Sequence, residues 1–227
     1  IVIRAQDPYF GWFLNVENKN KTYEEYLASY ITIARKYPHS RFLITNLSSN
    51  LQNFKSRGDV RKIFDILSSK YKGSMWGVRI VNYLSEEFQN MLLPTSRILQ
   101  KEEIIRDFTK YNLVIFTASW CKPCLEEIPL LKQIYKNVHE KVIFTYVSLD
   151  NEHGIKQFKE IIKQYEIPWR SLYAFGDLEK VKSQYLADVI PLNLFIAPDG
   201  TYQRIDVRKI DDEKKIYSAI GLTNIQQ

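Results

Sequence analysis

The sequence predicts an α/β domain, with a mostly parallel sheet covered by helices on both faces, preceded by an all-α region. Two observations support this fold class. Between residues 112 and 220, short apolar runs with strand character alternate with segments of helical periodicity, which is typical of parallel sheets. Between residues 22 and 84, apolar residues recur at helical spacing. We therefore expect a helical N-terminal region over 1–94 and the α/β domain over 95–227.

The N-terminal region is predicted to contain four helices after a short extended lead over 1–16. Thr22 and Glu25 form a capping-box pattern, which opens a helix that Pro38 ends. We interpret the apolar stripes of these helices as packing surfaces rather than as a docking face. A linker is expected around 92–98. The remaining helices are expected over 43–54, 60–71 and 74–84.

The C-terminal region is predicted to begin with a helix over 101–109. A buried strand follows, then the helix that carries the cysteines, and the alternation continues to a hairpin around Pro198, Asp199 and Gly200. The expected strands are 112–117, 142–149, 192–197 and 202–207. The expected helices are those ending near 138 and those over 155–165, 177–185 and 211–220.

Cys121 and Cys124 are the only two cysteines of the chain, and they lie at the junction of a predicted strand and helix. A thiolate at a helix N-terminus is stabilised by unpaired N–H groups and by the helix dipole, so Cys121 is the expected nucleophile. Lys122 adds a positive charge, and Pro123 suits a first helical turn. Cys124 would lie deeper and resolve a mixed disulfide. Trp120 places an aromatic ring beside the exposed sulfur.

Other interpretations of the pair are a zinc site and a purely structural disulfide. Zinc needs four ligands, but no second cysteine pair exists and the three histidines are scattered. We therefore expect no metal. A disulfide that closes so small a loop constrains the unfolded chain little. A one-cysteine peroxidase is excluded, because Val114 and Ala118 occupy the positions where it needs Pro and Thr.

Composition limits the classes of partner. Apolar residues make up 45% of the 227 residues, which predicts a packed core. The net charge is +6, but basic and acidic residues are interspersed, so no nucleic-acid partner is expected. No apolar run approaches the length of a membrane span. Because the chain begins at Ile1 without Met, we expect a processed or trimmed form whose signal peptide or lipid anchor would not be visible.

Three segments resemble the thioredoxin superfamily, and more narrowly the TlpA/ResA-like envelope thiol–disulfide oxidoreductases in the form common in Bacteroidetes. They are Phe116–Pro129, Val147–Asp150 and Val189–Gly200, and the resemblance covers about residues 96–220. It implies a thioredoxin-like fold with a central mixed sheet, and an insertion over 155–175. It also implies a periplasmic or envelope location, no cofactor beyond the dithiol, protein thiols and disulfides as partners, and an upstream electron-donor protein.

The resemblance also assigns roles. Pro191 would be the cis-proline that faces the dithiol, and the backbone of Ile190 would pair with a bound substrate strand. Glu127 would be an acid close to the sulfurs that passes protons, although an exposed helix residue remains the alternative. Ile115 stands where ordinary thioredoxins carry a buried Asp, which makes Glu127 more plausible as the acid. Leu192 replaces a Thr that often follows the proline, which leaves the substrate preference open.

The leading hypothesis is therefore a thiol–disulfide oxidoreductase that acts as a reductant, as TlpA-like relatives mostly do. One alternative is an isomerase or oxidant in which the helical region acts as a dimer platform or a substrate clamp. Another is a thioredoxin-fold binding module with a structural disulfide.

Overall fold

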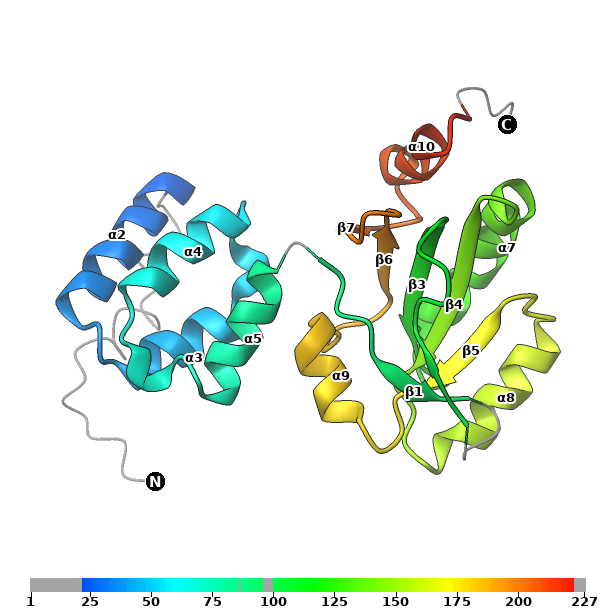
Figure 1. Ribbon diagram of the computed structural model, residues 1–227, viewed down its shortest axis with the longest axis horizontal. Helices are drawn as coiled ribbons and strands as arrows, with labels where there is room; N and C mark the ends of the chain where they lie inside the picture. The colour runs from blue at the N-terminus through cyan, green and yellow to red at the C-terminus, as the bar shows by residue number, and fades with distance from the viewer. Residues whose placement is uncertain (1–21, 86, 96–99, 223–227) are drawn as a thin grey trace. The chain divides into compact units, whose positions relative to one another are not determined.

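The computed structural model describes residues 22–85, 87–95 and 100–222 (Figure 1). The lead expected over 1–16 lies outside the described residues. Contacts divide the chain into two compact units, one that ends at Leu84 and one that begins at Ser85. The predicted division into domains at residues 94 and 95 stays a prediction.

The first unit is helical, as the sequence predicts. The helices expected over 43–54 and 60–71 both end before the last apolar residues of their patterns. Those residues lie instead in or beside short 3-10 helices, at Leu51–Asn53 and at Ser69–Tyr71. In the described part of this unit the α-helices are α2 (Tyr23–Lys36), α3 (Arg41–Ser49), α4 (Arg57–Ile66) and α5 (Met75–Leu84).

The capping box at the start of α2 is confirmed. The Thr22 hydroxyl accepts the backbone N–H of Glu25 at 3.2 Å, and the Glu25 carboxylate accepts the backbone N–H of Thr22 at 2.8 Å. Tyr30 of α2 is fully buried, and its hydroxyl donates to the Leu43 carbonyl at 3.1 Å. Its ring thus fills the core while its one polar atom keeps a hydrogen bond. Other core side chains of this unit are Ala34, Leu43, Leu47, Val60, Ile63 and Ile80.

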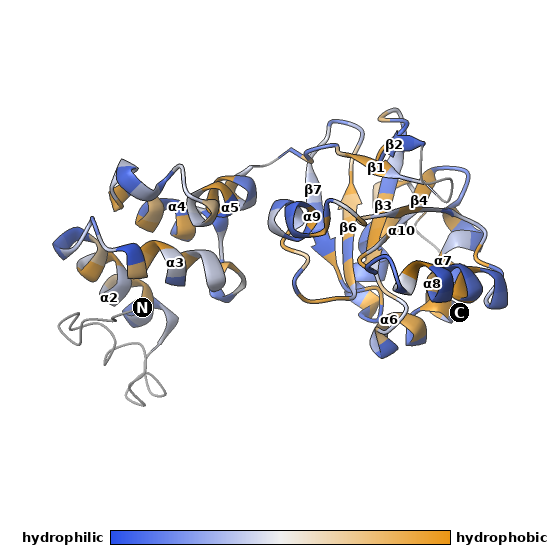
Figure 2. Ribbon diagram, turned by 90° about the horizontal axis from the view of Figure 1, so that it is seen from below, coloured by the Kyte–Doolittle hydropathy of each residue, from blue (hydrophilic) through white to orange (hydrophobic). Residues whose placement is uncertain are grey.

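The second unit contains a five-stranded mixed sheet in the order β5-β4-β3-β6-β7. The first three strands of this order are parallel, and the last two run antiparallel to their neighbours. The central strands are apolar along their length (Figure 2), which is expected of strands buried on both faces. The strands are β3 (Tyr111–Thr117), β4 (Val142–Ser148), β5 (Arg170–Tyr173), β6 (Leu192–Ile196) and β7 (Tyr202–Ile205).

Helices cover both faces of the sheet, which confirms the predicted fold class. One core cluster joins the sheet to α7 (Ile128–Val138), α8 (Gly154–Gln164) and α10 (Ile210–Ala219). A second cluster joins the opposite face to α9 (Leu178–Tyr185) and to residues preceding β3. Within the segment expected as an insertion, α8 is followed by β5, which is an edge strand of the sheet.

The helix predicted over 101–109 is wrong. Residues Lys101–Glu103 form strand β2, which pairs antiparallel with β1 (Leu92–Pro94), so the predicted linker also contains a strand. Residues 96–98 of the predicted linker lie outside the described residues.

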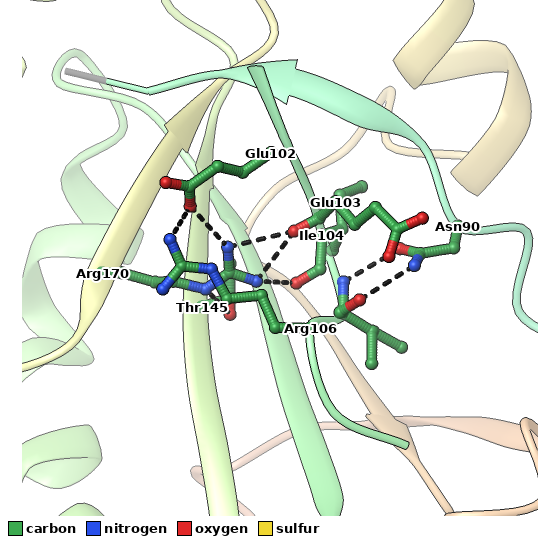
Figure 3. Close-up of polar contacts among 8 residues, drawn as sticks. Asn90, Glu102, Glu103, Ile104, Arg106, Thr145 and Arg170 are labelled. Atoms are coloured by element: carbon green, nitrogen blue, oxygen red, sulfur yellow. Dashed lines mark hydrogen bonds and ion pairs between the residues drawn. The ribbon is translucent and has the colours of Figure 1, made fainter. Parts of the chain in front are cut away.

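Side chains from outside the two strands hold this β1–β2 hairpin (Figure 3). Arg170 of β5 donates to the carbonyls of Glu103, at 3.0 Å, and of Ile104, and the Asn90 side chain pairs with both backbone groups of Ile105 at 2.9 Å. These long-range bonds outweigh the weak local preference for helix.

The turn between β6 and β7 follows the predicted Pro198-Asp199-Gly200 pattern. Gly200 has φ +84°, a left-handed conformation that favours glycine. The Asp199 carboxylate accepts the backbone N–H and the hydroxyl of Thr201 at 2.9 and 2.6 Å. In the part of the chain that the structure describes, no helix has the length and apolar character that crossing a membrane requires.

Candidate functional site

The two cysteines lie where β3 ends and helix α6 (Lys122–Glu126) begins, as the sequence predicts. Cys121 is the N-cap residue of α6, and its Sγ accepts the backbone N–H of Cys124 at 3.3 Å. The two residues form a disulfide, so the structure shows the oxidised pair. Pro123 lies in the first turn, where its missing N–H leaves no hydrogen bond unmade. The strand therefore delivers the first sulfur directly to a helix start.

The burial of the pair differs from the expectation. The sequence predicts an exposed Cys121 and a deeper Cys124, yet they are only 4% and 3% exposed. The two cysteines form a small buried cluster with Ala118, and Ile190 packs against this cluster. Lys122 points into solvent and lies 3.8 Å from Glu126, so water and a neighbouring carboxylate screen its charge. The helix start, rather than Lys122, is therefore the main local feature that would favour a thiolate at Cys121.

The Ile190–Pro191 peptide bond is cis, as the resemblance implies. Ile190, which precedes it, packs against the cluster of Ala118, Cys121 and Cys124 although it lies far along the chain. Two apolar side chains adjacent in sequence to these groups are open to solvent: Trp120, 66% exposed, and Val189, 68% exposed. The structure thus brings the proline loop to the dithiol and leaves apolar surface beside both segments.

Glu127 lies between α6 and α7 and is only 2% exposed. Its backbone is helical, so it follows Cys124 by three residues on one helix face, a spacing that places Cβ atoms about 5–6 Å apart. The helix breaks at Glu127 ahead of Pro129, which lacks the N–H needed to continue the ladder. The carboxylate is therefore buried close behind the dithiol rather than on the surface.

Burial raises the pKa of the Glu127 carboxyl, while Asn193 and the charge of Arg208 oppose that shift. The Asn193 amide donates to Oε2 at 3.5 Å, which is a long hydrogen bond. Among the described residues, no donor reaches Oδ1 of Asn193, and a protonated Glu127 would supply one beside it. The surroundings of Glu127 thus favour a carboxyl that holds its proton more readily than an exposed one.

Asp150 is a site residue that the sequence analysis did not single out. It follows β4, is fully buried, and accepts the backbone N–H and the hydroxyl of Ser119 at 2.9 and 2.6 Å. It also accepts the hydroxyl of Ser148 at 2.7 Å. Ser119 is two residues before Cys121, so Asp150 fixes the segment that carries the nucleophile. A signal was present, because polar residues after adjacent parallel strands meet at one edge of the sheet.

A metal centre finds no support in the described segments: no three His, Cys, Asp or Glu side chains gather there into a group that could hold an ion. The two sulfurs are instead bonded to each other at the start of α6, next to Ile190 of the proline loop.

Comparison with protein families identifies one match. Residues 109–202 match the family described as thioredoxin-like. This segment contains the cysteine pair, Glu127, Asp150 and the cis Ile190–Pro191 bond.

Several curated relatives carry the name thiol-disulfide oxidoreductase ResA, and two of them serve as examples. The protein of Oceanobacillus iheyensis is 33% identical over 92 residues, which are 40% of this chain and 45% of that protein. The protein of Bacillus cereus is 28% identical over 85 residues, which are 37% of this chain and 47% of that protein. The chain thus spans about half the length of these relatives.

A similar solved structure is the C-terminal domain of a putative thiol-disulfide oxidoreductase from Bacteroides thetaiotaomicron. It has a TM-score of 0.51 and 25% identity, and the match covers 60% of this chain and 93% of that one.

Proposed function

The chain belongs to the thioredoxin superfamily, among its TlpA/ResA-like members, and on this premise we propose that it is a protein thiol–disulfide oxidoreductase of the cell envelope. One observation supports this most directly: Cys121 caps a helix start next to Cys124, and Ile190 of the cis-proline loop packs against the cluster that the two cysteines form with Ala118. A structural disulfide needs neither the helix start nor the loop.

In the first step, the Cys121 thiolate attacks one sulfur of a substrate disulfide. A bond forms between Cys121 Sγ and that sulfur, the substrate S–S bond breaks, and the second substrate sulfur leaves as a thiolate that takes up a proton. The capping position of Cys121 supports this role, because helix N–H groups stabilise a negative sulfur.

In the second step, Cys124 loses its proton and attacks Cys121 Sγ. The Cys121–Cys124 disulfide forms, and the first substrate sulfur is released and protonated. We assign the acceptance of the Cys124 proton to Glu127, whose buried position three residues later supports the role. The product is the oxidised pair present in the structure. An upstream donor protein then returns two electrons and two protons, so no other cofactor is needed.

Substrate binding is assigned to the backbone of Ile190 beside Pro191, with Trp120 as an apolar contact. Because both sulfurs are almost fully buried, a substrate must bring its disulfide into contact with this loop rather than meet an exposed thiol. An extended substrate segment that bonds to the backbone at Ile190 would do so.

The activity test is the reduction of insulin by the protein with dithiothreitol. Cys121→Ser should abolish turnover because no nucleophile remains, whereas Cys124→Ser should still attack and accumulate a mixed disulfide. The two variants control for each other, since each removes one thiol from the same pair. Normal turnover by Cys121→Ser would end the proposal.

The direction of exchange is proposed to be reduction, in the periplasm or cell envelope. Equilibration of the Cys121–Cys124 pair with glutathione buffers tests this direction. A potential near that of thioredoxin, about −270 mV, agrees with a reductant, and a value near about −120 mV would instead indicate an oxidant.

A further inference from the structure

Arg208 and Asp206 lie over the buried Glu127 and carry no role in the exchange steps above. Both belong to the loop between β7 and α10, far from the cysteines in sequence. The Nε atom of Arg208 lies 3.2 Å from Oε1 of Glu127. The Glu127 side chain is 1% exposed and that of Arg208 is 53% exposed, so a surface cation reaches an interior carboxylate.

The same Nε atom lies 2.9 Å from Oδ1 of Asp206 and donates its hydrogen there. An arginine Nε carries only one hydrogen. Consequently Glu127 Oε1 receives no hydrogen bond from any described residue, although it lies within ion-pair distance. Glu127 is attracted by the charge of the Arg208 guanidinium but does not accept the Nε hydrogen.

The loop itself holds Arg208 in this position. Asp206 also accepts the backbone N–H of Arg208 at 3.2 Å, and the backbone N–H of Asp206 donates to Asp212 at 2.8 Å. The guanidinium therefore stands between two carboxylates, and Asp206 has the better hydrogen-bond geometry.

We propose that Asp206 and Arg208 are positioning residues that set the proton affinity of Glu127, because Asp206 competes with Glu127 for the single Nε hydrogen of Arg208. The proposal rests on the function assigned to Glu127 above. While Asp206 holds the hydrogen, Glu127 lacks the charge-assisted bond that would fix it as a carboxylate, and it can accept the Cys124 proton. If Arg208 turned fully to Glu127, the carboxylate would be stabilised and would accept that proton less readily.

Other charged or titratable groups also face this carboxyl. Tyr146 of β4 is buried, and burial with the charge of Glu127 raises the pKa of its phenol, so it stays neutral. The Cys121–Cys124 disulfide lies at the start of α6, and Glu126 pairs outward with Lys122. The charge of Asp206 acts with burial to raise the pKa of Glu127, and that of Arg208 opposes it.

The competition predicts opposite effects from neighbouring substitutions. Arg208→Gln removes the attracting charge and should raise the pKa of Glu127. Asp206→Asn keeps an acceptor for the loop but removes the competing charge, and should lower it. For a half-exposed ion pair, the expected change is about two- to fivefold in proton affinity. Lys214→Gln is the matched control, because it removes the same charge from an exposed side chain of α10 that makes no ion pair with Glu127, Asp206 or Arg208 among the described contacts.

The experiment titrates the Glu127 carboxyl by carbon NMR in the oxidised full chain, and then measures the pH profile of insulin reduction. The expected result is an alkaline shift of the Glu127 titration in Arg208→Gln, an acid shift in Asp206→Asn and none in Lys214→Gln. Shifts of the same sign in the first two variants, or shifts no larger than the control, would overturn the inference. A wild-type chain without insulin reduction would refute the proposed function instead, since the NMR titration needs no turnover.

Discussion

Asp150 offers the sharpest test of how the fold positions the dithiol. Replacing it with Ala removes the acceptor for three buried donor groups, the Ser119 N–H and hydroxyl and the Ser148 hydroxyl. A hydrogen bond to a charged group contributes about 1.5–3 kcal/mol, so simple addition gives about 4.5–9 kcal/mol. The true loss must be smaller, because water can enter the vacated space and the variant no longer buries a charge. We expect Asp150→Ala to lose about 3–5 kcal/mol of stability.

Asp199→Ala is a matched control for this variant. Asp199 accepts the N–H and hydroxyl of Thr201 with nearly the same distances, but it is exposed on a turn. Its replacement should change stability far less, because water satisfies the donors that it leaves.

The assay is hydrogen exchange of the β3 and β4 amides in the full chain, which reports the opening free energy of this unit alone. Asp150→Ala should speed exchange at the ends of β3 and β4, near Ser119 and Ser148, and Asp199→Ala should leave those amides protected. Equal protection in the two variants would refute the idea that Asp150 holds the cysteine segment in place.

Substitutions at Gly154, Arg170 and Glu127 test three other features of the second unit. Gly154→Ala should destabilise the second unit by about 1–3 kcal/mol, because a Cβ there would meet Asp150 Oδ1 at 2.5 Å. Gly73→Ala is the control, since its Cβ would meet nothing within 4 Å, and urea unfolding measures the stability of both variants. Arg170→Met should strip the hairpin carbonyls of their donors and speed exchange at β1 and β2, and Arg170→Lys should not rescue it, because a lysine lacks the forked geometry. Glu127→Gln should gain stability relative to wild type as pH rises: burial raises the folded-state pKa of Glu127 above its unfolded value, so the wild-type chain loses stability from pH 4.5 up through the folded pKa. Denaturation at a series of pH values tests this, and a difference independent of pH would contradict it.

The elements that could be predicted from the sequence have strong local patterns. The helix predicted over 155–165 is observed at Gly154–Gln164, because its apolar residues repeat at helical spacing and pack on the sheet. The β6–β7 hairpin was predictable because its turn chemistry is local. The β1–β2 hairpin was not, since Arg170 and Asn90 hold it from outside and its own residues carry no strand pattern.

The same distinction applies to the site. Cys121 and Cys124 could be found because strand, cap and thiols are contiguous in the chain. The burial of Cys121 could not, because only the fold brings Ile190 against the cluster that contains the two cysteines. Arg208 had no signal at all, because a basic residue in a polar loop is indistinguishable from any surface cation until its distance to Glu127 is known.

The hairpin ahead of β3 has a practical consequence for the choice of fragments. The family match begins at residue 109, but Phe88, Leu93 and Ile104 belong to the core on one face of the sheet. A truncated protein that started at the match would expose the apolar surface of Phe116 and its neighbours to water and would leave Arg170 without its backbone acceptors. Such a fragment would be prone to aggregation even though it retains every residue of the dithiol site, whereas one that starts near Ser85 keeps that face covered.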